Sequence, residues 1–429
     1  MESFIAPDYK ALKTDLVITT RLVPPAEHSF HDVMSQLIAA LDLGSPLSPQ
    51  CQAKAFKLNQ EQFTCQIAFP GKLFEEGNMP QLMSIISSVL ESPSIGHHAT
   101  IMDLSMPSQL QASFPGPGSS IQNIRERIGI SDRPLSSSVL RPKAGVAIKE
   151  YLSHAYHLWS GGCDIVEESG FMASTTENEF DERVSFLGKE RSQYIARTGQ
   201  QKIYIPNITA GTIQEMQRRA RKSKEHGVDY ILINADQIGL AAIASLRITS
   251  QELGLILCAN KSGVGLNSHH HGRISGKVIA LILRHLGINM LHIGSELNQE
   301  SKESSNTLTN AFSHQAEHHQ TCFPIITSEG SLRDIEDMII HLGNDLIIEG
   351  SAHVFRHPDG VKAGAQAFQQ AILAAAGGTD QLSAAEKNSA LKRALSMEPE
   401  KRSPKVSGLV WTPLPRSSSH REIDTFLSL

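Results

Sequence analysis

Residues that can bind anions or transfer protons stand in pairs at the ends of short apolar runs in the middle of the chain. Arg141 and Lys143 follow the run PLSSSVL, and their spacing places both side chains on one side of an extended segment. Glu167 and Ser169 follow the run CDIV with the same spacing. A cationic pair close to the acidic cluster of Glu167, Glu168 and Ser169 predicts a pocket that holds a phosphorylated small molecule and moves a proton.

The later apolar runs end in polar or small residues as well. His292 suits acid–base chemistry because an imidazole titrates near neutral pH. The small residues of SEG and EGS let backbone N–H groups approach a phosphate. Each candidate also has a plainer interpretation as a structural hydrogen bonder, and the histidines at 269–271 are interpreted as a loop or helix start. The further candidates are Asn207, Thr209, Asn260, Lys261, Ser295, Ser328, Gly330, Gly350 and Ser351.

A (β/α)8 barrel is the fold that would bring these residues together. Eight apolar runs alternate with helix-like segments over residues 131–378, close to the roughly 250 residues of such barrels. Thr212 with Glu215 forms a capping box, and Ser331 precedes apolar residues at helical spacing. A doubly wound sheet is the alternative, but no GxGxxG motif follows the first run. In barrels the catalytic side chains lie at the carboxyl ends of the strands, where these candidates stand.

The segments on either side of the barrel have other patterns. Residues 1–130 mix the strand-like runs DLVITTRLVP, FTCQIAFP and ATIMDLSMP with the helical stretches SFHDVMSQLIAAL and MPQLMSIISSVL, which predicts an α+β domain. Residues 379–429 are expected to begin with a helix capped by Ser383 and Glu386 and then to become mobile, because Ser, Pro and charge dominate there. The fold class is therefore α/β, an N-terminal α+β domain followed by a barrel.

Composition excludes several classes of protein. The 429 residues carry a formal charge of −5 without a long basic run, so nucleic acid is not an expected partner. The five cysteines form no CxxC pair, which favours reduced thiols. No segment has the length and apolar character of a membrane span or leader, and we expect a cytoplasmic protein.

Several longer motifs resemble one known family. The chain is similar to the RuBisCO large-subunit superfamily from about Phe63 to Phe368, through motifs that occur in a fixed order. The resemblance implies a barrel whose site is completed by the N-terminal domain of a partner subunit, hence a homodimer or a multiple of one. The motifs are IAFPGKLFEEGNMPQLMSIISSVL, FPGPGSSIQ, DRPLSSSVLRPKAGV, WSGGCDIVEESG, KIYIPNITAGTIQEM, HHGRISGKVIALILRHLG, MLHIG, PIITSEG and HVFRHPDGVKAGAQAF.

The resemblance assigns family positions to individual residues, some kept and some changed. Lys143, Asn207, His292 and Ser328 stand at family residues. Where the family has a lysine that becomes carbamylated and two carboxylates that join it in binding Mg²⁺, this chain has Glu167, Ser169 and Gly170. Further departures are Arg141 for the first lysine of KPK, Asn260 and Lys261 for His and Arg, Ser88 for an asparagine of the N-terminal domain and Gln299 for the loop-six lysine.

These departures predict a RuBisCO-like protein of form IV type that does not fix CO₂. The expected activity is proton transfer of an isomerase or enolase kind on a phosphorylated keto-sugar or related acid, with sulfur salvage as one setting. A non-catalytic relative that binds a phosphorylated ligand or a protein is the alternative.

Roles for individual residues follow from that hypothesis. Glu167 is the expected base, aided by Lys143 and His292. No metal is expected at Glu167, Ser169 and Gly170, since Mg²⁺ needs several hard oxygen ligands, and Mg²⁺ would bind weakly if at all. Glu167 is instead expected to form an ion pair with Arg141 or Lys143. The expected substrate-binding residues are Arg141, Asn207, Lys261, Ser328, Gly330, Gly350 and Ser351.

Overall fold

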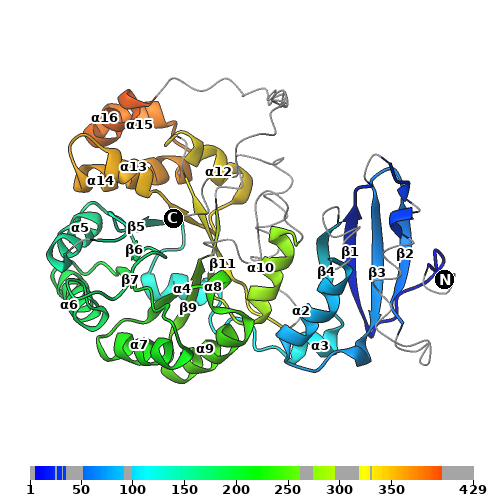
Figure 1. Ribbon diagram of the computed structural model, residues 1–429. Coiled ribbons are helices and arrows are strands. Elements are labelled where there is room, and N and C mark those ends of the chain that lie inside the picture. The colour runs from blue at the N-terminus through cyan, green and yellow to red at the C-terminus, as the bar shows by residue number, and fades with distance from the viewer. Residues whose placement is uncertain are drawn as a thin grey trace, which may run out of the picture.

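The computed structural model of the chain shows two sheets with different strand arrangements (Figure 1). A smaller antiparallel sheet with its helices forms the N-terminal part, and a ring of parallel strands covered by helices forms the rest. The α/β fold class predicted from the sequence is confirmed. The structure describes residues 5–24, 27–30, 32–34, 52–90, 99–145, 147–260, 274–294, 318–328 and 331–398.

The N-terminal sheet has four strands in the order β2-β3-β1-β4. Alternate residues of β1 are buried because one face of the sheet packs against helices, and α2 begins at the side-chain cap of Asn78. The three predicted strands are present, and β2 was missed because its residues KAFKLN do not alternate between buried and exposed positions. The elements are β1 (Asp15–Leu22), β2 (Lys54–Asn59), β3 (Thr64–Pro70), α2 (Met79–Ser87), β4 (Ala99–Ser105) and α3 (Ser108–Ala112). Most of the helix predicted at SFHDVMSQLIAAL lies outside the described residues.

The barrel contains eight parallel strands in the order β7-β6-β5-β12-β11-β10-β9-β8. Backbone hydrogen bonds close the ring between β7 and β8, where the Ile208 N–H donates to the Leu232 carbonyl and the Leu232 N–H to the Pro206 carbonyl. Each of the eight predicted apolar runs contains one strand. The strands are β5 (Leu135–Val139), β6 (Ile165–Glu167), β7 (Ile203–Ile205), β8 (Tyr230–Asn234), β9 (Ile256–Asn260), β10 (Met290–Gly294), β11 (Phe323–Thr327) and β12 (Ile347–Glu349).

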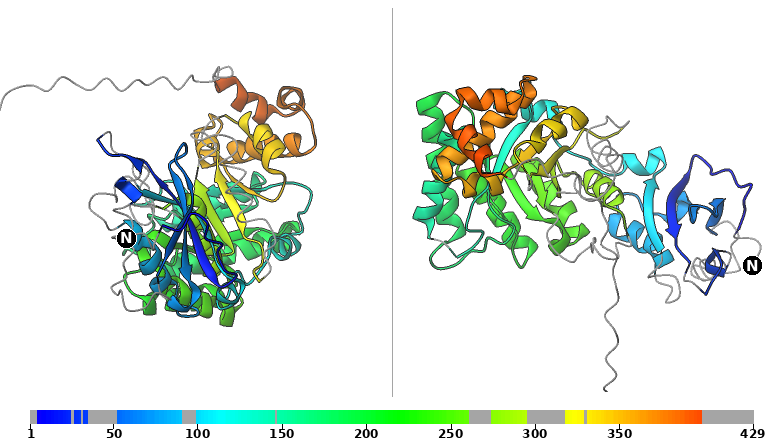
Figure 2. Two further views of the ribbon diagram at one scale, coloured as in Figure 1. Left: turned by 90° about the vertical axis from the view of Figure 1, so that its right-hand side faces the viewer. Right: turned by 90° about the horizontal axis from the view of Figure 1, so that it is seen from above.

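Helices surround the strands on the outside (Figure 1), and the right-hand view of Figure 2 shows the N-terminal sheet to one side of the barrel. The α7 helix is typical: Thr212 caps its N-terminus by accepting from the Glu215 N–H, which is one half of the predicted capping box, whereas the Glu215 carboxylate pairs with Arg218 and Arg219. Met216 and Ala220 lie one turn apart on its buried face. The helices are α4 (Ile121–Ile128), α5 (Ile148–Ser160), α6 (Phe180–Thr198), α7 (Ile213–Glu225), α8 (Ala235–Ile238), α9 (Leu240–Leu253), α10 (Gly276–His285), α12 (Asp334–Leu342), α13 (Ser351–Arg356) and α14 (Val361–Ala376).

The interior of the barrel is apolar over most of its depth. Ile121, Ile124 and Ile128 of α4 lie in one buried apolar cluster with side chains from all eight strands, including Leu135 and Phe323. Because α4 fills one end in this way, it belongs structurally to the barrel, although it precedes residue 131. Polar side chains then lie together toward the carboxyl ends of the strands, where the site is described below.

Two further contacts connect the N-terminal sheet and the C-terminal helices to the barrel. The Ser275 N–H donates to the Ile101 carbonyl of β4 over 2.8 Å, which joins the N-terminal sheet to the start of α10. Helices α15 (Gln381–Lys387) and α16 (Ser389–Met397) pack beside α14, and α15 is capped by Asp380, whose carboxylate accepts from the Ser383 N–H. The predicted helix is therefore present but begins earlier than predicted. No helix within the described part of the chain is both long and apolar enough to cross a membrane.

Candidate functional site

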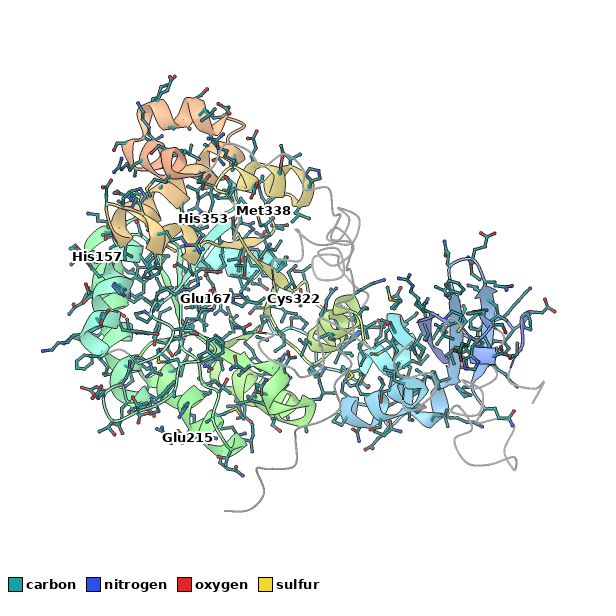
Figure 3. All side chains as sticks on the ribbon, turned by 45° about the horizontal axis from the view of Figure 1, so that its top comes forward. His157, Glu167, Glu215, Cys322, Met338 and His353 are labelled. Atoms are coloured by element: carbon teal, nitrogen blue, oxygen red, sulfur yellow. The ribbon has the colours of Figure 1, made fainter. Side chains whose placement is uncertain are left out.

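The centre of the site is a buried contact between Glu167 and His292, which come from β6 and β10 on different sides of the barrel. The Oε2 atom of Glu167 lies 2.8 Å from Nε2 of His292, and the Ser137 hydroxyl donates to Oε1. Glu167 is completely buried, whereas the His292 side chain keeps 10 % of its surface exposed. Contact with a ligand is therefore limited to the small exposed part of His292. Figure 3 shows Glu167 inside the ring of helices.

The two groups shift each other toward their charged forms. Burial alone would raise the pKa of Glu167, but the charge of His292 and the hydrogen bonds from His292 and Ser137 outweigh it, so the pKa is lowered. Burial alone would lower the pKa of His292, but Glu167, and to a lesser degree Glu349, raise it. The contact therefore favours the carboxylate form of Glu167 and the imidazolium form of His292.

The carboxyl end of β12 contributes a second buried carboxylate. Glu349 accepts from the N–H and the hydroxyl of Ser351, and the Val139 N–H donates to the Ser351 hydroxyl oxygen over 2.8 Å. The Gly350 N–H donates to the Ser137 carbonyl. The N–H groups of Gly350 and Ser351 thus already have protein partners, and their assignment to phosphate stays a prediction.

Glu168, the neighbour of Glu167, faces the other side of the strand and holds the loop behind the site. Arg183 donates to it over 2.6 Å in a pair with no exposed surface, and Tyr204 and the Asn207 N–H donate to it as well. Burial of an ion pair is tolerated where further hydrogen bonds satisfy both partners, as they do here. Glu168 therefore acts as an anchor between β6, β7 and α6.

Arg141 and Lys143 lie at the rim, on the segment after β5. The ammonium of Lys143 is 5.4 Å from the ring centre of Phe171, whose side chain is 64 % exposed. The ion pair expected between Glu167 and Arg141 or Lys143 is not found; the partner of Glu167 is His292. The prediction relied on the short distance along the chain between these residues and Glu167. That distance does not determine which side chains point into the barrel.

The residues at the family's metal-ligand positions do not form a Mg²⁺ site. Both oxygens of Glu167 are occupied by Ser137 and His292. The Ser169 hydroxyl accepts from the Phe171 N–H, and the carbonyls of Ser169 and Gly170 accept from the Asn207 amide. Among the residues that the structure describes, no three His, Cys, Asp or Glu side chains are grouped to hold a metal ion. The donor set lacks the several anionic oxygens that Mg²⁺ requires.

The Asn207 side chain serves the same loop rather than pointing freely into the mouth. Its amide donates to the carbonyls of Ser169, Gly170 and Met172, and its oxygen accepts from the Thr209 N–H. This geometry makes it a support for the loop after β6, and its role in substrate binding stays a prediction.

Ser328, at the end of β11, belongs to a line of residues that the sequence did not reveal. Its hydroxyl oxygen lies 3.1 Å from Nε2 of His353 in α13, and Nδ1 of His353 lies 3.8 Å from Oε1 of Glu398, just after α16. The three residues are separated by 25 and 45 positions in the chain, so no local spacing could have indicated them. The candidates Lys261, Ser295 and Gly330, together with the histidines at 269–271 and Gln299, lie outside the described residues.

The sequence as a whole matches known proteins of one family. The profile of the ribulose bisphosphate carboxylase large chain matches with its N-terminal domain over residues 3–110 and with its catalytic domain over residues 120–398. A ribulose bisphosphate carboxylase of Methanosarcina barkeri is 28% identical over 420 residues, which cover 92% of this chain and 98% of that protein. One of Pyrococcus abyssi is 32% identical over 361 residues, covering 81% of this chain and 83% of that protein.

Solved structures give the same result. The octameric ribulose-1,5-bisphosphate carboxylase/oxygenase of Pyrococcus horikoshii superposes with a TM-score of 0.84 at 29% identity and covers 92% of this chain and 97% of its own. The dimeric archaeal Rubisco of Hyperthermus butylicus has a TM-score of 0.82 at 26% identity, and the match covers 92% of this chain and 98% of that chain.

These relatives contradict the function predicted from the sequence. The expected absence of CO₂ fixation, the isomerase or enolase activity and the non-catalytic alternative are all set aside, because the matching relatives are named carboxylases. The comparisons do not support the form IV assignment either. The prediction gave more weight to a few substituted site positions than to the similarity of the whole chain.

Proposed function

Because the chain belongs to the ribulose bisphosphate carboxylase large-chain family, we propose that it is a carboxylase acting on ribulose bisphosphate at the carboxyl end of its barrel. The observation that carries the proposal is the extent of the similarity: relatives that bear this name match more than four fifths of the chain. The polar layer around Glu167 and His292 supports the location, since the rest of the barrel interior is apolar.

Carboxylation beside a carbonyl requires that a C–H bond be broken first. Its electron pair forms an enediolate, the proton passes to a group of the protein, and the enediolate carbon then bonds to CO₂. We assign the stabilisation of the enediolate oxygen to His292, whose raised pKa favours the imidazolium form and whose side chain keeps a small exposed surface. Glu167 orients the imidazole and favours its charged form, and the unprotonated amine of Lys143 at the rim takes up the proton from the C–H bond and becomes ammonium. No step of this proposal passes through a metal ion.

The phosphate groups of the substrate are assigned to the cations and small residues of the mouth. Arg141 and Lys143 lie on one side, and Ser328 lies at the end of β11. Lys261, Gly330, Gly350, Ser351 and Asn207 complete the set predicted from the sequence. Guanidinium and ammonium groups bind phosphate strongly, and hydroxyl groups orient it.

We also propose that the protein is a cytoplasmic homodimer, or a multiple of one, in which the N-terminal domain of one subunit closes the barrel of the other. The octameric and dimeric states of two solved relatives support self-association. The exposed ring of Phe171 beside Lys143 is an apolar surface at the rim that such a contact would cover.

The test is incubation of the purified protein with ribulose bisphosphate and radiolabelled bicarbonate. We expect label in phosphoglycerate, a loss of at least about a hundredfold in His292→Asn, and wild-type rates in Glu215→Gln on the outer helix α7. A folded protein that binds ribulose bisphosphate by calorimetry but incorporates no label would refute the proposal.

A further inference from the structure

The line from Ser328 through His353 to Glu398 joins the candidate phosphate site to the C-terminal helices. The Ser328 hydroxyl is 3.1 Å from Nε2 of His353, and the other ring nitrogen is 3.8 Å from Glu398. Side-chain exposure is only 8 % for His353 and 14 % for Glu398. Ring and carboxylate are thus largely removed from water.

Both His353 and Glu398 are held in place by other contacts. The Glu398 carboxylate accepts from the Leu332 N–H over 2.7 Å and from the Ser331 hydroxyl. The imidazole of His353 stacks on the ring of Phe368, with an angle of 16° between the planes. These contacts favour the ring orientation in which Nε2 faces Ser328. Figure 3 shows His353 between the strands and the C-terminal helices.

The proton on Nε2 decides what the Ser328 hydroxyl can offer to a ligand. A hydroxyl has one hydrogen and two lone pairs. When Nε2 is bare, it accepts that hydrogen, and Ser328 presents only lone pairs, which repel an anion. When Nε2 carries a hydrogen, it donates to the Ser328 oxygen, and the hydroxyl hydrogen is released for an anionic ligand.

The groups around His353 have opposing effects on its pKa. Burial lowers the pKa of His353 and is the largest effect, and Arg356 lowers it further. Glu398, Asp334 and a contact with the Ser328 backbone act in the opposite direction, but the net shift is downward. Without a ligand the ring is therefore mostly neutral near pH 7, and a neutral ring facing Glu398 carries its hydrogen on Nδ1. An anion at Ser328 adds a negative charge on the far side of the ring and favours the imidazolium.

We propose that an anionic group binds to Ser328 together with the uptake of one proton by His353, with Glu398 as the counter-charge that makes this possible. His353 and Glu398 are then positioning residues, since they act through Ser328. The inference rests on the proposed binding of a substrate phosphate at Ser328, but not on carboxylation.

Sulfate is the suitable probe, because its charge does not change between about pH 6 and about pH 8, unlike that of phosphate. Calorimetry of the full chain in two buffers of different ionisation enthalpy measures both affinity and proton uptake. We expect tighter binding at the lower pH, by up to about tenfold per pH unit, and an uptake approaching one proton.

Three variants separate this mechanism from a structural role. Ser328→Ala should bind sulfate more weakly at both pH values. His353→Gln places an amide N–H where Nε2–H would be, so it should keep the affinity of the low-pH state and lose most of the pH dependence and proton uptake. His341→Gln, at an exposed position of α12, should behave as the wild type.

Specific results would overturn the inference. The inference is wrong if the wild-type protein binds no sulfate at millimolar concentration, or if the Ser328→Ala variant binds sulfate as tightly as the wild type does. It is also wrong if the His353→Gln variant retains the full pH dependence and proton uptake. Failure of the labelled-bicarbonate assay would refute the carboxylase proposal and leave these results unaffected, because sulfate binding is measured without substrate.

Discussion

Replacement of Glu167 by glutamine tests whether the buried pair with His292 stabilises the barrel. At 2.8 Å the gross attraction between unit charges is about 6 kcal/mol at an effective dielectric constant of about 20. The cost of removing both groups from water offsets part of this, whereas loss of one partner leaves the other charge buried, at about 3–5 kcal/mol. We expect Glu167→Gln to lower the free energy of unfolding by that amount.

The two pKa shifts determine the pH range in which the loss of stability should be largest. The pKa of His292 is raised from 6.5 in the folded state, so its contribution is complete below about pH 6.5 and is lost as the pH rises through the raised value. The pKa of Glu167 is lowered from 4.5, so its contribution is complete above about pH 4.5 and is lost as the pH falls through the lowered value. The difference between wild type and variant should therefore be largest between about pH 4.5 and 6.5.

Urea unfolding of both proteins at several pH values measures this difference. The matched control is Glu215→Gln, whose carboxylate pairs with Arg218 and Arg219 on the partly exposed surface of α7 and should change stability by less than about 1 kcal/mol. Figure 3 labels both glutamates, one inside the barrel and one on its outer helices. Equal stability losses in the two variants, or a loss at Glu167 that does not depend on pH, would refute the reasoning.

Three further outcomes are expected. EDTA should leave the melting temperature and ribulose bisphosphate binding unchanged, because both oxygens of Glu167 are occupied; micromolar Mg²⁺ binding that Glu167→Gln abolishes would contradict this. Light scattering at micromolar concentration should give at least a dimeric mass, and a monomer would rule out the proposed closure of the barrel. Gly350→Ala should destabilise the protein by about 1–3 kcal/mol in urea unfolding, because an added Cβ would lie 2.4 Å from the Phe368 ring; unchanged stability would show that the ring moves away easily.

The strands and helices of the barrel could be predicted because their signals are local. Each strand lies within an apolar run, and Thr212 caps α7 as its spacing to Glu215 indicated. Contacts across the barrel have no local signal. His292 is 125 residues from Glu167, and the closing of the ring, not spacing along the chain, brings the two together. For the same reason the sequence suggested Arg141 and Lys143 as partners and gave no indication of His353 or Glu398.

The serines of β5 show how such contacts nevertheless shape the sequence. Ser136, Ser137 and Ser138 are fully buried in a strand that was recognised by its apolar character, and neighbouring side chains of a strand point to opposite faces. The Ser136 hydroxyl donates to Asp164 on the outer face, and the Ser137 hydroxyl donates to Glu167 on the inner face. Buried carboxylates on the adjacent strand require donors at these positions, and a small hydroxyl supplies one without filling the space that apolar neighbours need. A run of buried serines beside acidic residues thus indicates a polar layer in a barrel, although it does not indicate which imidazole completes it.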